Sequence, residues 1–163
     1  MDSIPQILQR LNDHGVNFVV IGGVAAILHG SVRTTLDVDV CAPLDEPNLG
    51  RILSALRGTD PRWRMHPKRP ALTDDLESLK GFKALYLDTD IGIVDVITEV
   101  TGVGGFDEVA RHAIPVDAGS VKCQVLDLDT LIVAKRAVGR RKDLDAVIEL
   151  EVIRQHLARR QDP

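Results

Sequence analysis

One stretch decides the fold: GGVAAILHGSVRTTLDVDV, which runs from Gly22 to Val40. Its last part alternates acidic and apolar residues, with Asp37 and Asp39 on either side of Val38. This alternation is typical of a β-strand whose two faces differ, so we expect both carboxylates on one face, about 7 Å apart along the strand. Two carboxylates held so close repel each other, and a divalent cation is a natural way to stabilise them together.

The donor atoms indicate which cation to expect. Carboxylate oxygens are hard ligands, and Cys41 and Cys123 lie far apart with no CxxC pattern. The pattern therefore predicts Mg²⁺, or Mn²⁺, rather than zinc, and it predicts that both cysteines are buried thiols. The alternative interpretation of Asp37 and Asp39 is the solvated face of an edge strand.

The Gly22-Gly23 pair opens the stretch and follows a short β-branched run, Asn17 to Ile21, that predicts a buried strand. We expect a tight turn at the two glycines and a helix from Val24 to His29. Glycines let the backbone approach a ligand closely, and its amides can then donate to phosphate oxygens. Gly30-Ser31 is a rival turn, but only five residues separate it from Asp37, too few for an intervening helix.

The order of these features resembles the signature of the nucleotidyltransferase superfamily: a Gly-Gly or Gly-Ser pair, a helix, and then Asp-x-Asp. Arg33 and Thr35 precede the acidic pair as they do in bacterial AbiEii-type toxins and related small nucleotidyltransferases, which the chain resembles more closely. The resemblance implies a nucleotide-binding role for four residues: Gly22, Gly23, Arg33 and Thr35.

The superfamily usually supplies a third carboxylate from a later strand, and Asp95 is the candidate here. All of its neighbours in Ile93-Val94-Asp95-Val96-Ile97 are apolar, where a lone carboxylate is costly unless it faces a polar partner or a metal. By resemblance, Asp95 joins Asp37 and Asp39 as a catalytic metal ligand, and it is the group expected to orient or deprotonate the acceptor. A salt-bridged structural Asp is the alternative.

The resemblance continues near the end of the chain. Lys135 precedes the cluster Arg140-Arg141-Lys142-Asp143, and relatives carry a similar lysine followed by Arg-x-Lys-Asp. The resemblance implies that Lys135 has a catalytic role in contact with the triphosphate and that Arg140 assists in binding it. Judged by the residues alone, such charges on a helix are more often solvated or paired within the helix, for instance Asp143 with Arg140 or Lys142.

The remaining segments predict an α/β domain with the nucleotidyltransferase fold, in which a mixed, mainly antiparallel sheet is flanked by helices. We expect one domain over 1–163, with a helical C-terminal part from about residue 129. Helices are expected at 4–13, with Ser3 as the cap, at 47–56, at 107–112 and at 129–158, with a break near Gly139. Strands are expected at 35–42, near Trp63, and in two hairpins, 82–87 with 91–98 and 113–116 with 121–125. Residues 58–79 are expected to be otherwise irregular, and 102–105 to form a loop.

Composition limits the function classes. The net charge of −4 gives no overall attraction to polyanions, although basic clusters at 62–69 and 136–142 leave nucleic acid open as a substrate. The chain has only five aromatic residues, which disfavours a stacking platform for single-stranded nucleic acid. It shows neither a signal peptide nor a membrane span, so we expect a cytoplasmic protein with no membrane partner.

These features together predict a magnesium-dependent nucleotidyltransferase. It would move a nucleoside monophosphate from a nucleoside triphosphate, such as ATP, to a hydroxyl acceptor on a transfer RNA end, a protein or a small molecule. The resemblance also implies a component of a toxin–antitoxin pair, with a partner protein or a homo-oligomer. Two alternatives stay open: an aminoglycoside or lincosamide nucleotidyltransferase, and a non-catalytic module that binds a nucleotide or a partner on the same fold.

Overall fold

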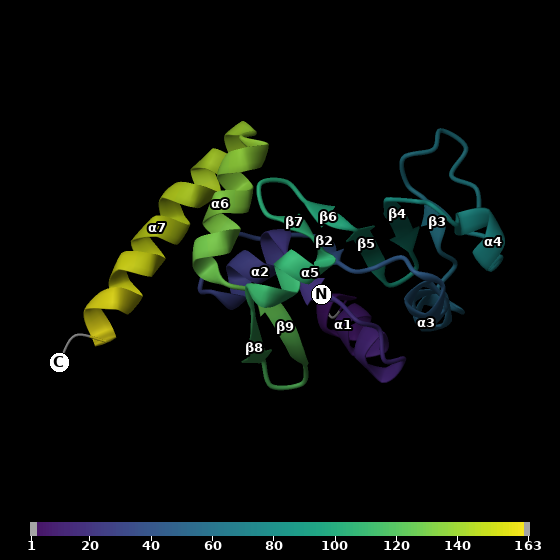
Figure 1. The fold of residues 1–163 in the computed structure, drawn as a ribbon, viewed down its shortest axis with the longest axis horizontal. Coiled ribbons are helices and arrows are strands. Elements are labelled where there is room, and N and C mark those ends of the chain that lie inside the picture. The colour runs from purple at the N-terminus through teal and green to yellow at the C-terminus, as the bar shows by residue number, and fades with distance from the viewer. Residues whose placement is uncertain (1–2, 162–163) are drawn as a thin grey trace.

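A mixed sheet flanked by helices organises the chain in the computed structural model, which describes residues 3–161 (Figure 1). The seven strands of this sheet are ordered β3-β4-β5-β2-β1-β9-β8. The pairs β2–β5 and β1–β9 are parallel, and the other four neighbouring pairs are antiparallel. The strands are β1 (Val19–Val20), β2 (Asp37–Cys41), β3 (Arg62–Trp63), β4 (Ala84–Thr89), β5 (Gly92–Ile97), β8 (Ala113–Asp117) and β9 (Lys122–Leu126). The expected fold class is therefore confirmed.

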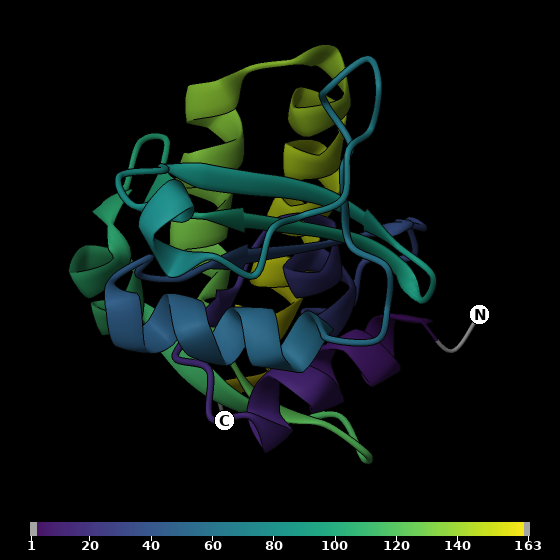
Figure 2. The ribbon, with the colours of Figure 1, turned by 90° about the vertical axis from the view of Figure 1, so that its right-hand side faces the viewer.

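The helices lie on two sides of this sheet. Figure 2 shows α1 and α3 beneath the strands, whereas Figure 1 shows α6 and α7 side by side at the other end of the molecule, next to α2. The helices are α1 (Ser3–Asp13), α2 (Gly22–Leu28), α3 (Glu46–Leu56), α4 (Leu76–Leu79), α5 (Phe106–Arg111), α6 (Leu128–Val138) and α7 (Arg141–Gln161). No helix in this described range is long and apolar enough to pass through a lipid bilayer.

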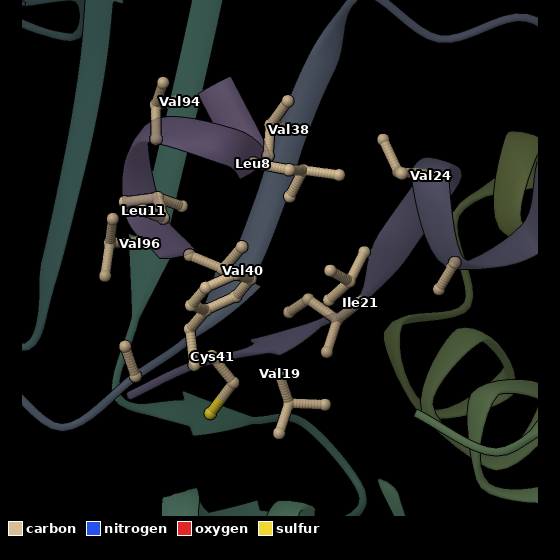
Figure 3. Close-up of a cluster of buried hydrophobic side chains, with 14 of the residues drawn as sticks. Leu8, Leu11, Val19, Ile21, Val24, Val38, Val40, Cys41, Val94 and Val96 are labelled. Carbon is tan, nitrogen blue, oxygen red and sulfur yellow. The ribbon is translucent and has the colours of Figure 1, made fainter. Parts of the chain in front are cut away.

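The core orients the central strands. Helix α1 places Leu8 and Leu11 one turn apart on its buried side, against the valines of β2 and β5 (Figure 3). These valines are Val38, Val40, Val94 and Val96, and each is at most 1% exposed. Because successive side chains of a strand point to opposite faces, burying the valines under α1 turns the intervening aspartates to the other face.

Four local expectations were wrong. The expected 17–21 strand is only Val19–Val20, because the backbone N–H and C=O of Asn17 are both bonded to the side chain of Asn48. Helix α2 already begins at Gly22, since the Ala25 amide donates to the Ile21 carbonyl and closes the first turn there. Residue Ser3 lies inside α1 and is not its cap.

The fourth wrong expectation is the loop at 102–105. Gly104–Gly105 forms β7, which pairs with β6 (Glu99–Val100) in a separate two-stranded sheet. Gly102 and Gly104 have φ of +81° and +129°, and this left-handed backbone lets the chain reverse tightly enough to pair with itself. Within the irregular excursion of 58–79, the structure adds the short helix α4 to the expected strand near Trp63.

The two C-terminal helices meet at the expected break. Asp127 caps α6 by accepting from the Thr130 amide at 2.7 Å, and Gly139 ends the helix with φ of +69°. Helix α7 then starts at Arg141 and runs back along α6. This reversal brings both helices to the side of the sheet where α2 begins.

We predict that the same substitution has opposite effects at two glycines. Gly139→Ala should lower the free energy of unfolding by about 1 kcal/mol, because a Cβ disfavours the left-handed conformation. Gly50→Ala should raise it by about 0.5–1 kcal/mol, since Gly50 lies inside α3 with open space around it. Urea unfolding of both variants measures the difference, and equal effects would contradict the role given to the Gly139 backbone.

Candidate functional site

Three carboxylates share the sheet face that α1 leaves open. Asp39 on β2 is the in-register neighbour of Asp95 on β5, and Asp37 lies two residues before Asp39 on the same face. The three side chains that the sequence predicts to be neighbours are therefore brought together by strand pairing.

The charges of this cluster interact. Burial, then the charges of Asp95 and Asp37, raises the pKa of Asp39 to about 6, while the Gly23 amide and Lys135 oppose the rise. Burial also raises the pKa of Asp95, against the lowering effect of Arg64. Negative charge is thus poorly compensated at Asp39, which is a favourable position for a cation.

The carboxylate oxygens are donors that suit magnesium, but they do not surround an ion completely. Among residues 3–161, no three His, Cys, Asp or Glu side chains are arranged to hold an ion by themselves. Magnesium is usually held by one or two carboxylates together with water and substrate phosphates, so Asp37 and Asp39 fit it as a pair. Cys41 and Cys123 are free and buried, as expected.

Asp95 already has a protein partner. Arg64, which follows β3, donates to both of its carboxylate oxygens through Nη2, one contact being 2.6 Å. Both side chains are mostly buried, at 23% and 12% exposure. The Nε of Arg64 is buried without a hydrogen-bond partner in the described structure, and an unpaired buried donor costs about 1–3 kcal/mol. A rearrangement that gave this Nε a hydrogen-bond acceptor would therefore be favourable.

The two glycines allow close packing around the carboxylates. Gly22 has φ of +64°, and a Cβ built there would collide with the carboxylate of Asp39. A Cβ on Gly23 would meet the Thr35 side chain at 2.9 Å. The Gly23 amide donates a hydrogen bond to the Asp39 carboxylate and so orients it.

Arg33 is held by the last helix. Glu149 on α7 accepts from the Ser31 hydroxyl at 2.9 Å, from the Val32 amide at 2.8 Å and from Arg33 Nε at 3.2 Å. A single carboxylate thus fixes the segment that leads into β2 and places the Arg33 guanidinium beside the cluster.

Lys135 and Arg140 approach from α6 and the α6–α7 junction. Asp143, a buried residue in the first turn of α7, accepts from Arg140 Nε at 2.6 Å and lies 4.0 Å from the Lys135 ammonium. Burial lowers the pKa of Lys135, while Asp143 and Asp39 oppose the lowering. The pairing of Asp143 with Arg140, which was the alternative prediction, is thus present. Asp143 holds both Lys135 and Arg140 near Asp39 on β2.

One cleft of about 280 Å³ gathers these groups. It is lined by every residue that the sequence predicts for the site except Asp95: Gly22, Gly23, Arg33, Thr35, Asp37, Asp39, Lys135 and Arg140. A smaller pocket of about 180 Å³ shares Gly22, Asp39 and Lys135 with it and continues between apolar side chains of β5 and α6. The cleft thus joins three acidic residues, Asp37, Asp39 and Asp143, to several cations and opens beside an apolar recess. We call it the polar cleft.

The comparison with protein families bears directly on this arrangement. A family model described as a nucleotidyltransferase of unknown function (DUF6036) matches residues 2–157. The chain belongs to this nucleotidyltransferase family. The superfamily resemblance is therefore supported over nearly the whole chain, whereas the narrower likeness to AbiEii-type toxins stays a prediction. A search of the curated proteins found no match.

In this member of the family, two residues beside the site were not predicted from the sequence: Arg64 and Glu149. Arg64 stood only as one member of a basic cluster, and its partner Asp95 is 31 positions away. Glu149 lies 116 positions from Arg33 on a helix rich in charge, so nothing in the local pattern distinguishes it from a solvated residue.

We predict that Glu149→Gln lowers stability by about 1 kcal/mol at neutral pH and by nothing in acid. The Val32 amide, Ser31 and Arg33 lower the pKa of Glu149. A group with a depressed folded-state pKa stabilises the fold above its unfolded-state pKa, and this contribution is lost as the pH falls through the folded value. Thermal unfolding across this pH range measures the effect, with the exposed Glu99→Gln as control. A difference that stays constant down to acid pH would contradict the role of the charge.

Proposed function

We propose that this chain binds a nucleoside triphosphate in the polar cleft and transfers its nucleoside monophosphate to a hydroxyl acceptor. One observation carries the proposal: the polar cleft gathers a carboxylate pair, two glycines and the cations Arg33, Lys135 and Arg140 on one side of the sheet. Membership of a nucleotidyltransferase family supports the same reaction class.

The cations bind the phosphates in this proposal. Arg33 offers a planar guanidinium that matches phosphate oxygens, and Lys135 offers a mostly buried ammonium whose charge is weakly screened by water. Arg140 assists from the junction between α6 and α7. The apolar recess beside Asp39 is of a kind that accepts a nucleobase or ribose.

Asp37 and Asp39 hold magnesium in this proposal, with Mn²⁺ as the substitute. When bound, the ion would neutralise charge on the reacting phosphate and on the leaving group. The backbone of Gly22 and Gly23 leaves space for this, because any larger side chain at either position would enter the volume of Asp39 or Thr35.

Asp95 serves the acceptor. The hydroxyl oxygen forms a bond to the α-phosphorus while the bond to the bridging oxygen of the β-phosphate breaks, so pyrophosphate leaves. The hydroxyl proton passes to the Asp95 carboxylate, whose burial favours the protonated form. Arg64 holds this carboxylate in place beside Asp39.

A non-catalytic nucleotide-binding module is the second candidate, and one observation favours it: Arg64 occupies both oxygens of Asp95. The two candidates differ in turnover. The deciding experiment incubates the chain with magnesium and each labelled triphosphate, against total RNA, cell protein, aminoglycosides and lincosamides. Transfer of label supports the enzyme, and nucleotide binding with no transfer to any acceptor supports the module. Growth arrest by the wild-type chain but not by an inactive variant would support the toxin role.

We predict that Asp37→Ala and Asp39→Ala each reduce magnesium-dependent transfer by about a hundredfold or more while the protein stays folded. The loss follows from removing half of the cation-binding pair, and relief of charge repulsion protects the fold. Label transfer and thermal unfolding without divalent cation are measured together. The exposed Asp145→Ala on α7 is the matched control, and an active Asp39→Ala protein would refute the assignment.

We predict that Arg33→Ala and Lys135→Ala each weaken triphosphate binding about tenfold, because each removes a charge-assisted contact to phosphate. Equilibrium binding of a non-hydrolysable triphosphate measures the loss, and the affinity for magnesium alone should change little. Arg159→Ala, at the exposed end of α7, provides the control. Unchanged nucleotide affinity in both variants would remove these residues from the site.

A further inference from the structure

A second hollow lies on the opposite side of Asp95 from the polar cleft. It has a volume of about 580 Å³ and is formed by β3, β4, α4 and the loop between β3 and α4. In Figure 1 these elements lie at the end of the molecule away from α6 and α7. We call it the aromatic groove. Six of its lining residues carry the argument: Trp63, Met65, His66, Pro67, Phe82 and Tyr86.

The groove concentrates a rare residue type. Only five residues of the chain are aromatic, and three of them line this one hollow: Trp63, Phe82 and Tyr86. Trp63 and Phe82 pack with their ring centroids 5.2 Å apart, while Met65 is 70% exposed and Phe82 is 42% exposed. Large apolar side chains that face solvent together mark a binding surface more often than a structural one.

The groove leads to the reacting groups. Tyr86 on β4 is the in-register neighbour of Asp95 on β5, which in turn neighbours Asp39 on β2, so the three side chains form a row across one sheet face. Arg64 extends along this row, with its guanidinium carbon 6.0 Å from the centre of the Tyr86 ring and its Nη2 on Asp95. A molecule seated against Tyr86 therefore has Asp95 at its end.

Three arginines beside the groove are already paired with carboxylates. Asp60 binds Arg62 at 2.8 Å, Asp88 binds Arg69 at 3.0 Å, and Asp95 binds Arg64. No Asp, Glu, Lys or Arg of residues 3–161 lines the groove itself, including the remaining cation of the cluster, Lys68. The basic cluster at 62–69, which had left nucleic acid open as an acceptor, thus offers little free positive charge to a phosphate backbone. The groove also offers no carboxylate to a polycationic sugar such as an aminoglycoside.

We propose that the aromatic groove is the acceptor site and that the acceptor is a neutral, ring-bearing small molecule with a hydroxyl group. This inference rests on the proposed transfer reaction and names its acceptor class. The groove volume lies within the range of about 300–1,000 Å³ that is usual for small-molecule sites, and the apolar lining suits a ring system. The acceptor hydroxyl passes Tyr86 to reach Asp95. The nucleotide lies on the other side of Asp95, in the polar cleft.

The chain carries its own reporter for a test, because Trp63 is its only tryptophan and lines the groove. The probes are a size-graded panel of neutral ring-bearing alcohols, from 2-phenylethanol to a steroid alcohol, a single-stranded oligoribonucleotide and an aminoglycoside. Each is titrated against the full chain while Trp63 fluorescence is recorded. We expect saturable changes with members of the alcohol panel and none with the other two probes.

Two variants and a control locate the binding. Met65→Ser and Phe82→Ala should weaken alcohol binding about tenfold each, and Ile148→Ser, an equally exposed apolar position on α7, should leave it unchanged. In the transfer assay, Met65→Ser should raise the KM for the alcohol and leave the KM for the triphosphate unchanged. Having two groove variants protects the test against misfolding of either one.

The outcomes separate this inference from the proposed function. Saturable alcohol binding that both groove variants weaken supports it. Binding of the oligoribonucleotide or the aminoglycoside in place of every alcohol overturns it, and so does the absence of any alcohol binding while the polar cleft still binds triphosphate. A chain that binds alcohols in the groove but no triphosphate refutes the proposed function instead.

Discussion

Mutual repulsion among three carboxylates on one sheet face is the constraint on which the rest of the site depends. Parallel pairing of β2 with β5 places Asp39 beside Asp95, and the valines between them are fixed under α1. The sheet cannot separate the charges without exposing its core. Compensation must therefore come from outside the two strands, and it does so from two directions: Arg64 on the β3 side and Lys135 on the α6 side. Lys135 lines the polar cleft, whereas Arg64 lies between Trp63 and Met65, which line the aromatic groove, so the two cations mark the sides of the cluster on which the two hollows lie.

The polar cleft is assembled from both ends of the chain. Its acidic floor comes from β2 and its glycines from α2, whereas its cations come from α6 and α7. Two carboxylates of α7 join these parts, Glu149 by holding residues 31–33 and Asp143 by holding Lys135 and Arg140. Acidic residues of α7 thus set the positions of Arg33, Lys135 and Arg140. A cation that is paired with a carboxylate on one side is held in place, and its other side can still contact a phosphate.

Periodicity was enough to predict the parts of the site that are local. The alternation in 35–42 predicted the common face of Asp37 and Asp39, because successive side chains of a strand point to opposite faces. Asp95 was added to this pair by the resemblance to the nucleotidyltransferase superfamily. The break at Gly139 was predicted from a glycine within the helical stretch 129–158. Contacts made over long distances in sequence were beyond the pattern, since neither Arg64 nor Glu149 differs locally from a solvated charge. The predicted extent of the 17–21 strand was wrong for a similar reason: Asn48, whose side chain forms hydrogen bonds with the backbone of Asn17, lies 31 residues away. The gathering of three aromatics around one groove depends on how 58–86 folds back on the sheet, which no period encodes.

The parallel pairing of β1 with β9 has a consequence for the chain as it leaves the ribosome. Val20 meets Val125, so a central pair of the sheet joins residues more than a hundred positions apart. Such pairings have a high entropic cost of loop closure and form late. While the chain is being synthesised, β2 and its aspartates emerge long before the helices that neutralise them, and domains generally complete folding as units during synthesis. The nascent protein therefore passes through a long interval in which its acidic residues exist without their cations, and the polar cleft is complete only when α7 docks.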